Sequence, residues 1–192
     1  MARCTIALAA KALAAAFVAV SMPAAAQDYV EAADPFIGTY VGVAEVFDGE
    51  GELLETRDMD IEIFYGDRNQ LTLRWINVSL VDGRRDVPGV ERRVQQMVLV
   101  EGGPHGSLIE DTRGSVFSGR RNVEVMAGDA LHWARFQDGR LDVFSFGVNA
   151  LGEPVLHDYE RILTEQGLEI VFDAYIDGRL VRHIVGNAIR VE

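Results

Sequence analysis

Four Asp-Gly pairs divide the chain, and each one stands between stretches in which apolar and polar residues alternate. They are Asp48-Gly49, Asp82-Gly83, Asp138-Gly139 and Asp177-Gly178. Both residues of a tight hairpin turn must tolerate a positive φ, which Asp and Gly do more readily than most residues. No segment shows the longer apolar period of an extended helix. The chain is therefore expected to fold as a series of β-hairpins.

The stretches between the turns alternate with a period of two residues. In the range 168–177 the even-numbered positions are apolar and the odd-numbered ones are mixed. Leu141 and Val143 likewise oppose Asp142 and Phe144. Successive strand residues point to opposite faces, so this pattern predicts an antiparallel sheet with one face in a core.

About ten strands are expected, and one of eleven candidate starts is expected to be a loop. The starts fall near Gly38, Glu52, Leu71, Glu91, Ser107, Arg121, Leu131, Arg140, Pro154, Leu168 and Leu180. Hairpins that follow one another without a long crossover make an up-and-down antiparallel meander. Such a meander leaves two unpaired edges unless it closes. An all-β fold closed into a barrel is therefore favoured over a sandwich.

The first 26 residues differ in composition from the rest. Arg3 and Lys11 are their only charged residues, the range 12–20 is apolar, and Ala24-Ala25-Ala26 precedes Gln27. This is the pattern of a cleavable signal peptide, and its apolar run is far short of the roughly 20 residues that span a bilayer. The sequence thus predicts a bacterial protein exported to the periplasm, or secreted, without a stable membrane anchor. The expected divisions are a signal peptide at 1–26, a short polar lead at 27–34 and a single barrel domain at 35–192.

Composition excludes several functions for residues 27–192. Cys4 and Lys11 are the only cysteine and lysine, so the remaining chain has neither a disulfide nor a Schiff-base lysine. This part of the chain contains 16 arginines and 30 acidic residues, and its net negative charge argues against nucleic acid as a partner. No metal site is expected, because no two of the four histidines have the close spacing of a zinc motif. They are His105, His132, His157 and His183.

The two ends of the expected barrel carry a resemblance to a known superfamily. The first strand begins Gly38-Thr39-Tyr40, and the last one ends with Arg190 followed by Val191. This pair resembles the calycins, which include lipocalins, fatty-acid-binding proteins and nitrobindin-like barrels. In those proteins a Gly-x-Trp opens the first strand, and an arginine of the last strand packs over the aromatic ring. The resemblance implies a cup-shaped barrel with an apolar cavity, closed structurally by Gly38, Tyr40 and Arg190, with tyrosine in place of tryptophan.

The segment 155–163 is the richest in polar groups. Strand geometry places His157, Tyr159 and Arg161 on one face, and Asp158 and Glu160 on the other. If the first set faces inward, it offers an imidazole, a phenol and a fixed cation for an anionic head group. In that orientation the apolar walls of the candidate ligand site would come from Trp75, Phe144, Phe146 and Phe172. If the second set faces inward instead, the first is simply a polar outer face.

Three functions stay open at the level of sequence. The first is a barrel that binds a small apolar or amphipathic molecule in its interior. The second is a structural or protein-interaction barrel with a filled core and a protein partner. The third is an isomerase or cyclase, in which His157 or Tyr159 would act as the acid–base group, although no catalytic motif is present. No cofactor is expected, with haem on His157 or His183 as a minor possibility that the nitrobindin-like resemblance implies.

Overall fold

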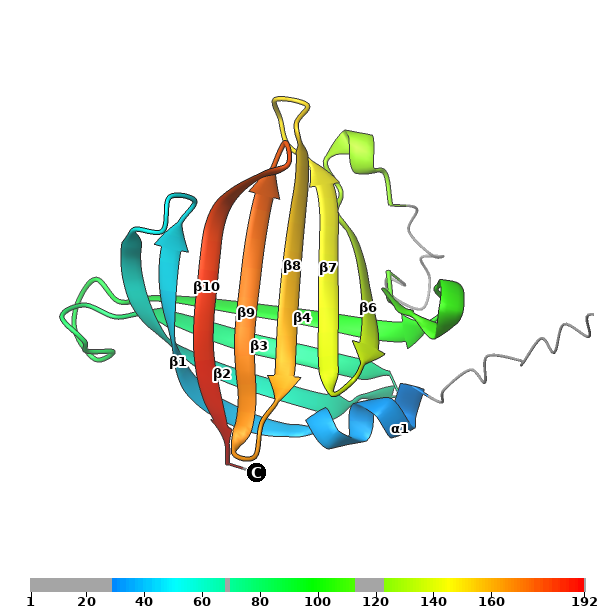
Figure 1. Ribbon diagram of the computed structural model, residues 1–192, viewed down its shortest axis with the longest axis horizontal. Helices are drawn as coiled ribbons and strands as arrows, with labels where there is room; N and C mark the ends of the chain where they lie inside the picture. Colours follow the sequence, from blue (N-terminus) through cyan, green and yellow to red (C-terminus); the bar gives the residue numbers. More distant parts are fainter. Residues whose placement is uncertain (1–28, 68–69, 113–122, 192) are drawn as a thin grey trace, which may run out of the picture.

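The computed structural model describes residues 29–67, 70–112 and 123–191, and these form a closed antiparallel barrel (Figure 1). Each strand pairs with its neighbours in chain order, and β10 returns to β1, which confirms the expected all-β meander. The strands are β1 (Gly38–Asp48), β2 (Leu53–Tyr65), β3 (Leu71–Ser79), β4 (Glu91–Glu101), β5 (Leu108–Glu110), β6 (Leu131–Gln137), β7 (Arg140–Val148), β8 (Pro154–Leu163), β9 (Gly167–Ile176) and β10 (Arg179–Arg190).

Ten of the eleven expected strand starts lie within one residue of an observed strand. The remaining one, at Arg121, lies outside the described residues. The short 3-10 helices η3 (Pro104–Gly106) and η4 (Val125–Ala127) flank β5 and β6 in the chain. No described helix is long and apolar enough to cross a membrane.

The Asp-Gly pairs form the turns that the sequence predicts, with one exception. Asp82, Asp138 and Asp177 each have a φ near 50°, and the glycine that follows each one also has a positive φ. This is the left-handed geometry that a tight hairpin turn requires. At the β1–β2 turn the positive φ falls instead on Gly51, and the Asp48 carboxylate accepts the backbone N–H groups of Glu50 and Glu52.

The strand pairing that closes the barrel is long between β1 and β10 and short on both sides of β5. β1 and β10 pair continuously from Tyr40 to Asp48. The three-residue strand β5, in contrast, meets β4 at three positions and β6 at only two. Within the described residues, the first half of β4 pairs only with β3, and Val94 there is 60% exposed. The barrel wall is therefore least complete beside this half of β4.

The described part of the expected polar lead, together with Pro35 and Phe36, packs against the barrel. It forms α1 (Tyr29–Ala33) and the 3-10 helix η1 (Asp34–Phe36), which lie across one end of the strands in Figure 1. Ala33 and Phe36 are buried, and the Phe36 ring lies 5.4 Å from that of Phe136. The Tyr65 hydroxyl donates to the Val30 carbonyl at 2.8 Å. Burial of these apolar groups explains why the segment caps the barrel rather than remaining in solvent.

The barrel interior has a filled half and an open half. Large apolar side chains fill the half beside α1 and η1 at nearly complete burial. They include Tyr40, Ile63, Leu71, Leu73, Leu99, Leu141 and Leu168. Farther along the same inner face, polar residues replace them, so the core does not extend through the whole barrel.

Candidate ligand-binding cavity

His157, Tyr159 and Arg161 lie on the inner face of β8. Tyr159 pairs with Val143, and Arg161 pairs with Leu141, across the boundary with β7. Val143 and Leu141 belong to the buried core, and directly paired residues point to the same face of a sheet. Of the two orientations that the sequence allowed, the structure therefore has the one that turns the imidazole, the phenol and the guanidinium inward.

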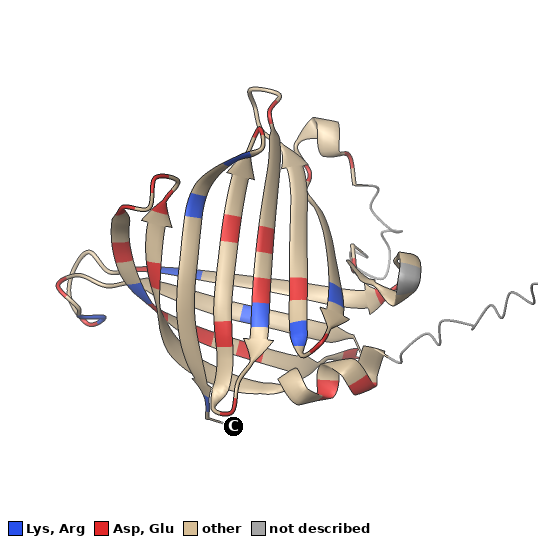
Figure 2. Ribbon diagram, in the orientation of Figure 1, with Lys and Arg blue, Asp and Glu red and all other residues tan. Residues whose placement is uncertain are grey.

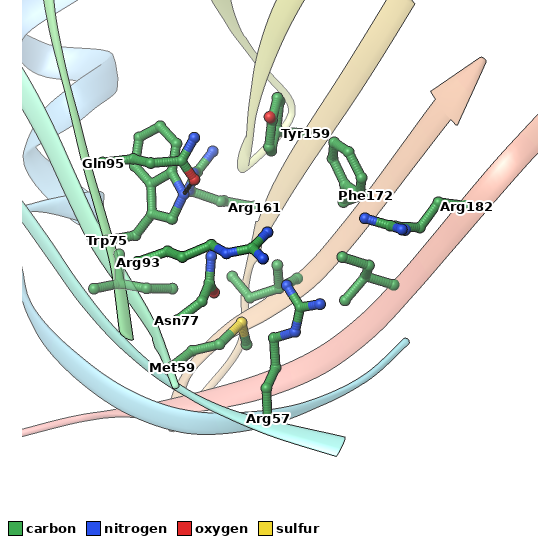
Figure 3. Close-up of a pocket in the computed structure, with 13 residues that line it drawn as sticks. Arg57, Met59, Trp75, Asn77, Arg93, Gln95, Tyr159, Arg161, Phe172 and Arg182 are labelled. Atoms are coloured by element: carbon green, nitrogen blue, oxygen red, sulfur yellow. Dashed lines mark hydrogen bonds between the residues drawn. The ribbon is translucent and has the colours of Figure 1, made fainter. Parts of the chain in front are cut away.

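A cavity of about 310 Å³ occupies the open half of the barrel (Figure 3). Its walls come from the inner faces of β2, β3 and β4 on one side and of β8, β9 and β10 on the other. The lining residues are Arg57, Met59, Ile61, Trp75, Asn77, Arg93, Gln95, Tyr159, Arg161, Ile170, Phe172, Arg182 and Ile184. The lining thus contains four arginines and no acidic residue, although acidic residues outnumber basic ones in the chain.

Arg161 is a buried cation without an anionic partner. It is only 4% exposed, and it forms no ion pair with any described residue. Its Nε and Nη1 atoms are buried, and their N–H groups donate to no acceptor among the described residues. Its guanidinium carbon lies 5.5 Å from the Trp75 ring centre and 6.0 Å from that of Tyr159. Burial lowers the pKa of Arg161 to about 10, so it still carries its charge at neutral pH.

Three aromatic rings line the cavity beside Arg161. Trp75 lies 6.0 Å from Tyr159, and Tyr159 lies 4.5 Å from Phe172, measured between ring centres. The Trp75 Nε1–H donates to Oε1 of Gln95 at 2.8 Å, which orients the indole. Burial also raises the pKa of Tyr159. These rings, tilted relative to one another, give the cavity an aromatic wall against which a conjugated or aromatic molecule could pack.

Of the other three cavity arginines, two form ion pairs with acidic residues of their own strands. Arg57 pairs with Glu55, and Arg93 pairs with Glu91 at 3.1 Å. Arg182 is exposed and has no ion pair with a described residue. A second hollow of about 390 Å³ shares Arg57, Asn77, Arg93 and Arg182 with the cavity. It continues outward past Glu55, Ser79, Leu80, Val81, Gly89 and Glu91, and so forms the mouth.

His157 lies beside the cavity rather than among its lining residues. Its ring is 5.5 Å from Phe172 and 6.2 Å from Tyr159. Burial lowers the pKa of His157, and the positive potentials of His132 and Arg182 lower it further. In the empty protein His157 is therefore held in its neutral form near neutral pH.

Two of the aromatic residues expected to line the ligand site lie on the outer face of the barrel. Phe144 and Phe146 lie on the outer surface of β7, where Phe144 stacks on Trp133 at 5.2 Å and the Arg135 guanidinium covers it. The alternation of the strand explains this, because Leu141 and Val143 occupy the inward positions. Trp75 and Phe172, by contrast, do line the cavity.

His183 also faces outward, so it does not reach the interior as a haem ligand would need to. Its Nδ1 lies 2.7 Å from the Asp173 carboxylate on the neighbouring strand, on the outer face. The described residues contain no group of three or more His, Cys, Asp or Glu side chains that could hold a metal ion.

The sequence prediction missed nine lining residues of the cavity, and five of them are polar. The polar ones are Arg57, Asn77, Arg93, Gln95 and Arg182. Each one lies on its strand two residues beyond an inward-facing residue, on the side toward the mouth. On β2, for example, Arg57 follows the inward-facing Ile63, Ile61 and Met59. That continuation is a signal in the sequence, but convergence of the residues depends on the closing of the barrel.

The outer face of β7, β8 and β9 carries acidic residues, whereas the charged residues of the cavity lining are arginines. Figure 2 shows two acidic positions on each of β8 and β9 and one, Asp142, on β7. On β8, Asp158 stands directly opposite Asp173. Burial and then the neighbouring carboxylates, that of Glu160 first, raise the pKa of Asp158 to about 6. The barrel wall therefore separates a cationic interior from an anionic exterior.

No protein-family model matches the chain, and no curated protein matches it in sequence. An S-type phycobiliprotein lyase, CPES from Guillardia theta, is 11% identical over 85% of this chain and 93% of the lyase, with a TM-score of 0.39. A protein of unknown function from the DUF3598 family of Nostoc punctiforme is 11% identical over 84% and 98% of the two chains, with a TM-score of 0.27. These scores carry no inference about function, and membership of the calycins stays a prediction.

Proposed function

We propose that this protein binds a small molecule with an acidic group and a flat apolar body inside its barrel. One observation carries the proposal: Arg161 is a nearly fully buried guanidinium that faces the cavity and has no anionic partner in the part of the chain that the structure describes. A buried charge without a partner costs free energy, and proteins usually pair such groups. The acidic group of a ligand would supply the missing partner.

Arginine suits this role because its planar fork can bind a carboxylate through two parallel hydrogen bonds. Two N–H groups of Arg161, on Nε and Nη1, are without a partner. These two nitrogens lie on different sides of the guanidinium, so hydrogen-bond donors on both sides lack an acceptor among the described residues. The acid would bind to this guanidinium, while the rest of the molecule packs against Trp75, Tyr159 and Phe172.

The volume of the cavity fits a molecule of this kind. At about 310 Å³ it falls at the lower end of the roughly 300–1,000 Å³ that ligand pockets occupy. The lining is mostly apolar apart from its arginines, Asn77 and Gln95. A filled interaction barrel is less well supported, because only the half beside α1 is packed with large side chains.

Binding can be measured through Trp75. The chain has only two tryptophans, and Trp133 lies on the outer face, so Trp133→Phe leaves Trp75 as the single reporter. In this background, naphthalene-2-carboxylate should bind at least tenfold more tightly than its uncharged methyl ester. A charge-assisted hydrogen bond contributes about 1.5–3 kcal/mol, which supports a factor of this size.

Arg161→Gln should remove the preference for the acid. Arg84→Gln is the matched control, because Arg84 is an exposed loop arginine that does not line the cavity. Equal affinity for acid and ester in the parent protein would overturn the proposal. Unchanged affinity for the acid in Arg161→Gln would overturn it as well.

Export to the periplasm is the second part of the proposal. The basic start, the apolar run and the Ala-x-Ala site before Gln27 support it. A binding protein with a closed barrel and no cysteine after Cys4 would need no disulfide to fold in that compartment.

A further inference from the structure

We infer, on the basis of the proposed function, that the ligand carries two acidic groups, one bound by Arg161 and the other by Arg182. The ligand class is thus a diacid with an apolar spacer. The inference comes from the charges of the cavity, because two of its four arginines are paired with acids at the mouth and the other two have no acidic partner among the described residues.

The first step concerns the four arginines of the lining. Arg57 is paired with Glu55, and Arg93 with Glu91, each two residues away on the same strand. Both acids stand at the mouth. Arg161 and Arg182 have no acidic partner among the described residues. Two positive charges are therefore left for a ligand to neutralise.

The second step concerns their separation. Arg161 pairs with Ile170, whereas Arg182 pairs with Ala174, four residues farther along β9. At about 3.3 Å per residue, four positions correspond to roughly 13 Å along the strands. Arg161 is buried in the barrel and Arg182 is exposed at the mouth. The two arginines therefore stand in different rows of the inner face, and a ligand with an acid at each end of a spacer would reach both.

The third step concerns what lies between the two arginines. The intervening inner row consists of Tyr159, Phe172 and Ile184, which pair with one another across β8, β9 and β10. Figure 3 shows Phe172 between the side chains of Arg161 and Arg182. The wall that joins the two cations is therefore apolar and largely aromatic, as the spacer of a diacid requires.

His157 lies beside the outer end, in the same inner row as Ala174 and Arg182. Burial lowers its pKa, and the charges of His132 and Arg182 lower it further. An acid bound at Arg182 would oppose the effect of these charges and favour the protonated imidazole.

The experiment compares diacids with their monomethyl esters by isothermal titration calorimetry at low salt. One pair is biphenyl-4,4′-dicarboxylate and its monomethyl ester, which have a rigid spacer. The other is dodecanedioate and its monomethyl ester, whose flexible spacer adapts to the distance between the subsites. The proteins are the parent, Arg161→Gln, Arg182→Gln and the control Arg179→Gln, an exposed arginine on the same strand that does not line the cavity.

In the parent and in Arg179→Gln, the diacid of at least one pair should bind about fivefold to tenfold more tightly than its monoester. This is the range for a partly exposed ion pair, so the advantage should shrink in high salt. Arg182→Gln should reduce the ratio of diacid affinity to monoester affinity to about one. Arg161→Gln should weaken both members of the pair by tenfold or more.

Three results would overturn the inference, and they differ in what they imply for the proposed function. If monoesters bind through Arg161 but neither diacid gains affinity, the second subsite is wrong and the proposed function stands. If a diacid gains affinity that Arg182→Gln does not remove, the assignment of Arg182 is wrong. If neither diacids nor monoesters bind, the proposed function fails together with the inference.

Discussion

The guanidinium of Arg190 lies over the ring of Tyr40, 5.2 Å from its centre, and Nη2 donates to the Tyr40 hydroxyl at 2.6 Å. This contact joins the end of the last strand to the start of the first. The same hydroxyl donates to the Phe36 carbonyl at 2.8 Å, and Arg190 also donates to the Pro35 carbonyl. Two residues thus attach the η1 cap to the seam at which the barrel closes.

Loss of the Tyr40 hydroxyl should destabilise the protein. Tyr40 is fully buried, so Tyr40→Phe leaves the Phe36 carbonyl and the Arg190 guanidinium without one partner each. The expected loss in the free energy of unfolding is about 1–3 kcal/mol. Urea denaturation measures it, and the double variant with Arg190→Gln should lose less than the sum of the two single variants. Additive losses would show that the two residues act independently.

Replacement of Arg161 by methionine should stabilise the protein while it abolishes acid binding. Methionine has a similar length and removes a buried charge that has no anionic partner. Substitution of buried charged groups by apolar residues of similar volume often raises stability by about 1–4 kcal/mol. Urea denaturation of the ligand-free protein provides the measurement. A less stable Arg161→Met variant would mean that the contacts with Trp75 and Tyr159 outweigh the cost of burial.

The carboxyl of Asp158 should make the protein less stable as the pH rises. Its pKa in the folded state is about 6, above the ordinary value of 3.8, so the folded protein holds this proton more tightly than the unfolded chain does. Its contribution is present below about pH 4 and is lost as the pH rises through about 6. Asp158→Asn should therefore be more stable than the parent at pH 7.5, with a difference that narrows toward pH 4. Glu169→Gln, on the neighbouring strand, is the control, and an equal gain there would point to general charge reduction.

An acidic ligand should shift the titration of His157. Burial lowers the pKa of this imidazole below the ordinary value of 6.5 in the empty protein. A carboxylate bound in the cavity favours the protonated form, so the midpoint should rise when naphthalene-2-carboxylate binds. Histidine resonances followed by NMR across pH 4 to 8 give the midpoint. The methyl ester should produce no upward shift, and an equal shift with both compounds would exclude a charge effect.

Cleavage of the signal peptide should produce a mature chain that begins at Gln27. The Ala24-Ala25-Ala26 segment has the small residues that a signal peptidase requires. Intact-mass measurement of the protein from the periplasmic fraction identifies the N-terminus. An alanine-to-leucine change at Ala26 should block cleavage and keep the protein at the membrane. An unprocessed chain in the soluble fraction of the parent would contradict the prediction.

The sequence by itself determined the strands, their order and the sides on which residues share a face. Asp-Gly turns and two-residue alternation are local properties, so the ten strands could be placed before any tertiary contact was known. The grouping of His157, Tyr159 and Arg161 also followed from alternation alone.

The tertiary structure decided which face of each strand is inside. A period of two residues divides a strand into two faces, but only the apolar residues of the paired strands determine which of those faces lies in the core. On β8, Leu141 and Val143 of the paired strand turned Tyr159 and Arg161 inward, and on β7 the same residues left Phe144 outside. Only closure of the barrel could bring arginines from β2, β4, β8 and β10 around one cavity, since they are far apart in the chain. The cap of α1 and η1 likewise depends on an apolar barrel end that no local pattern reveals.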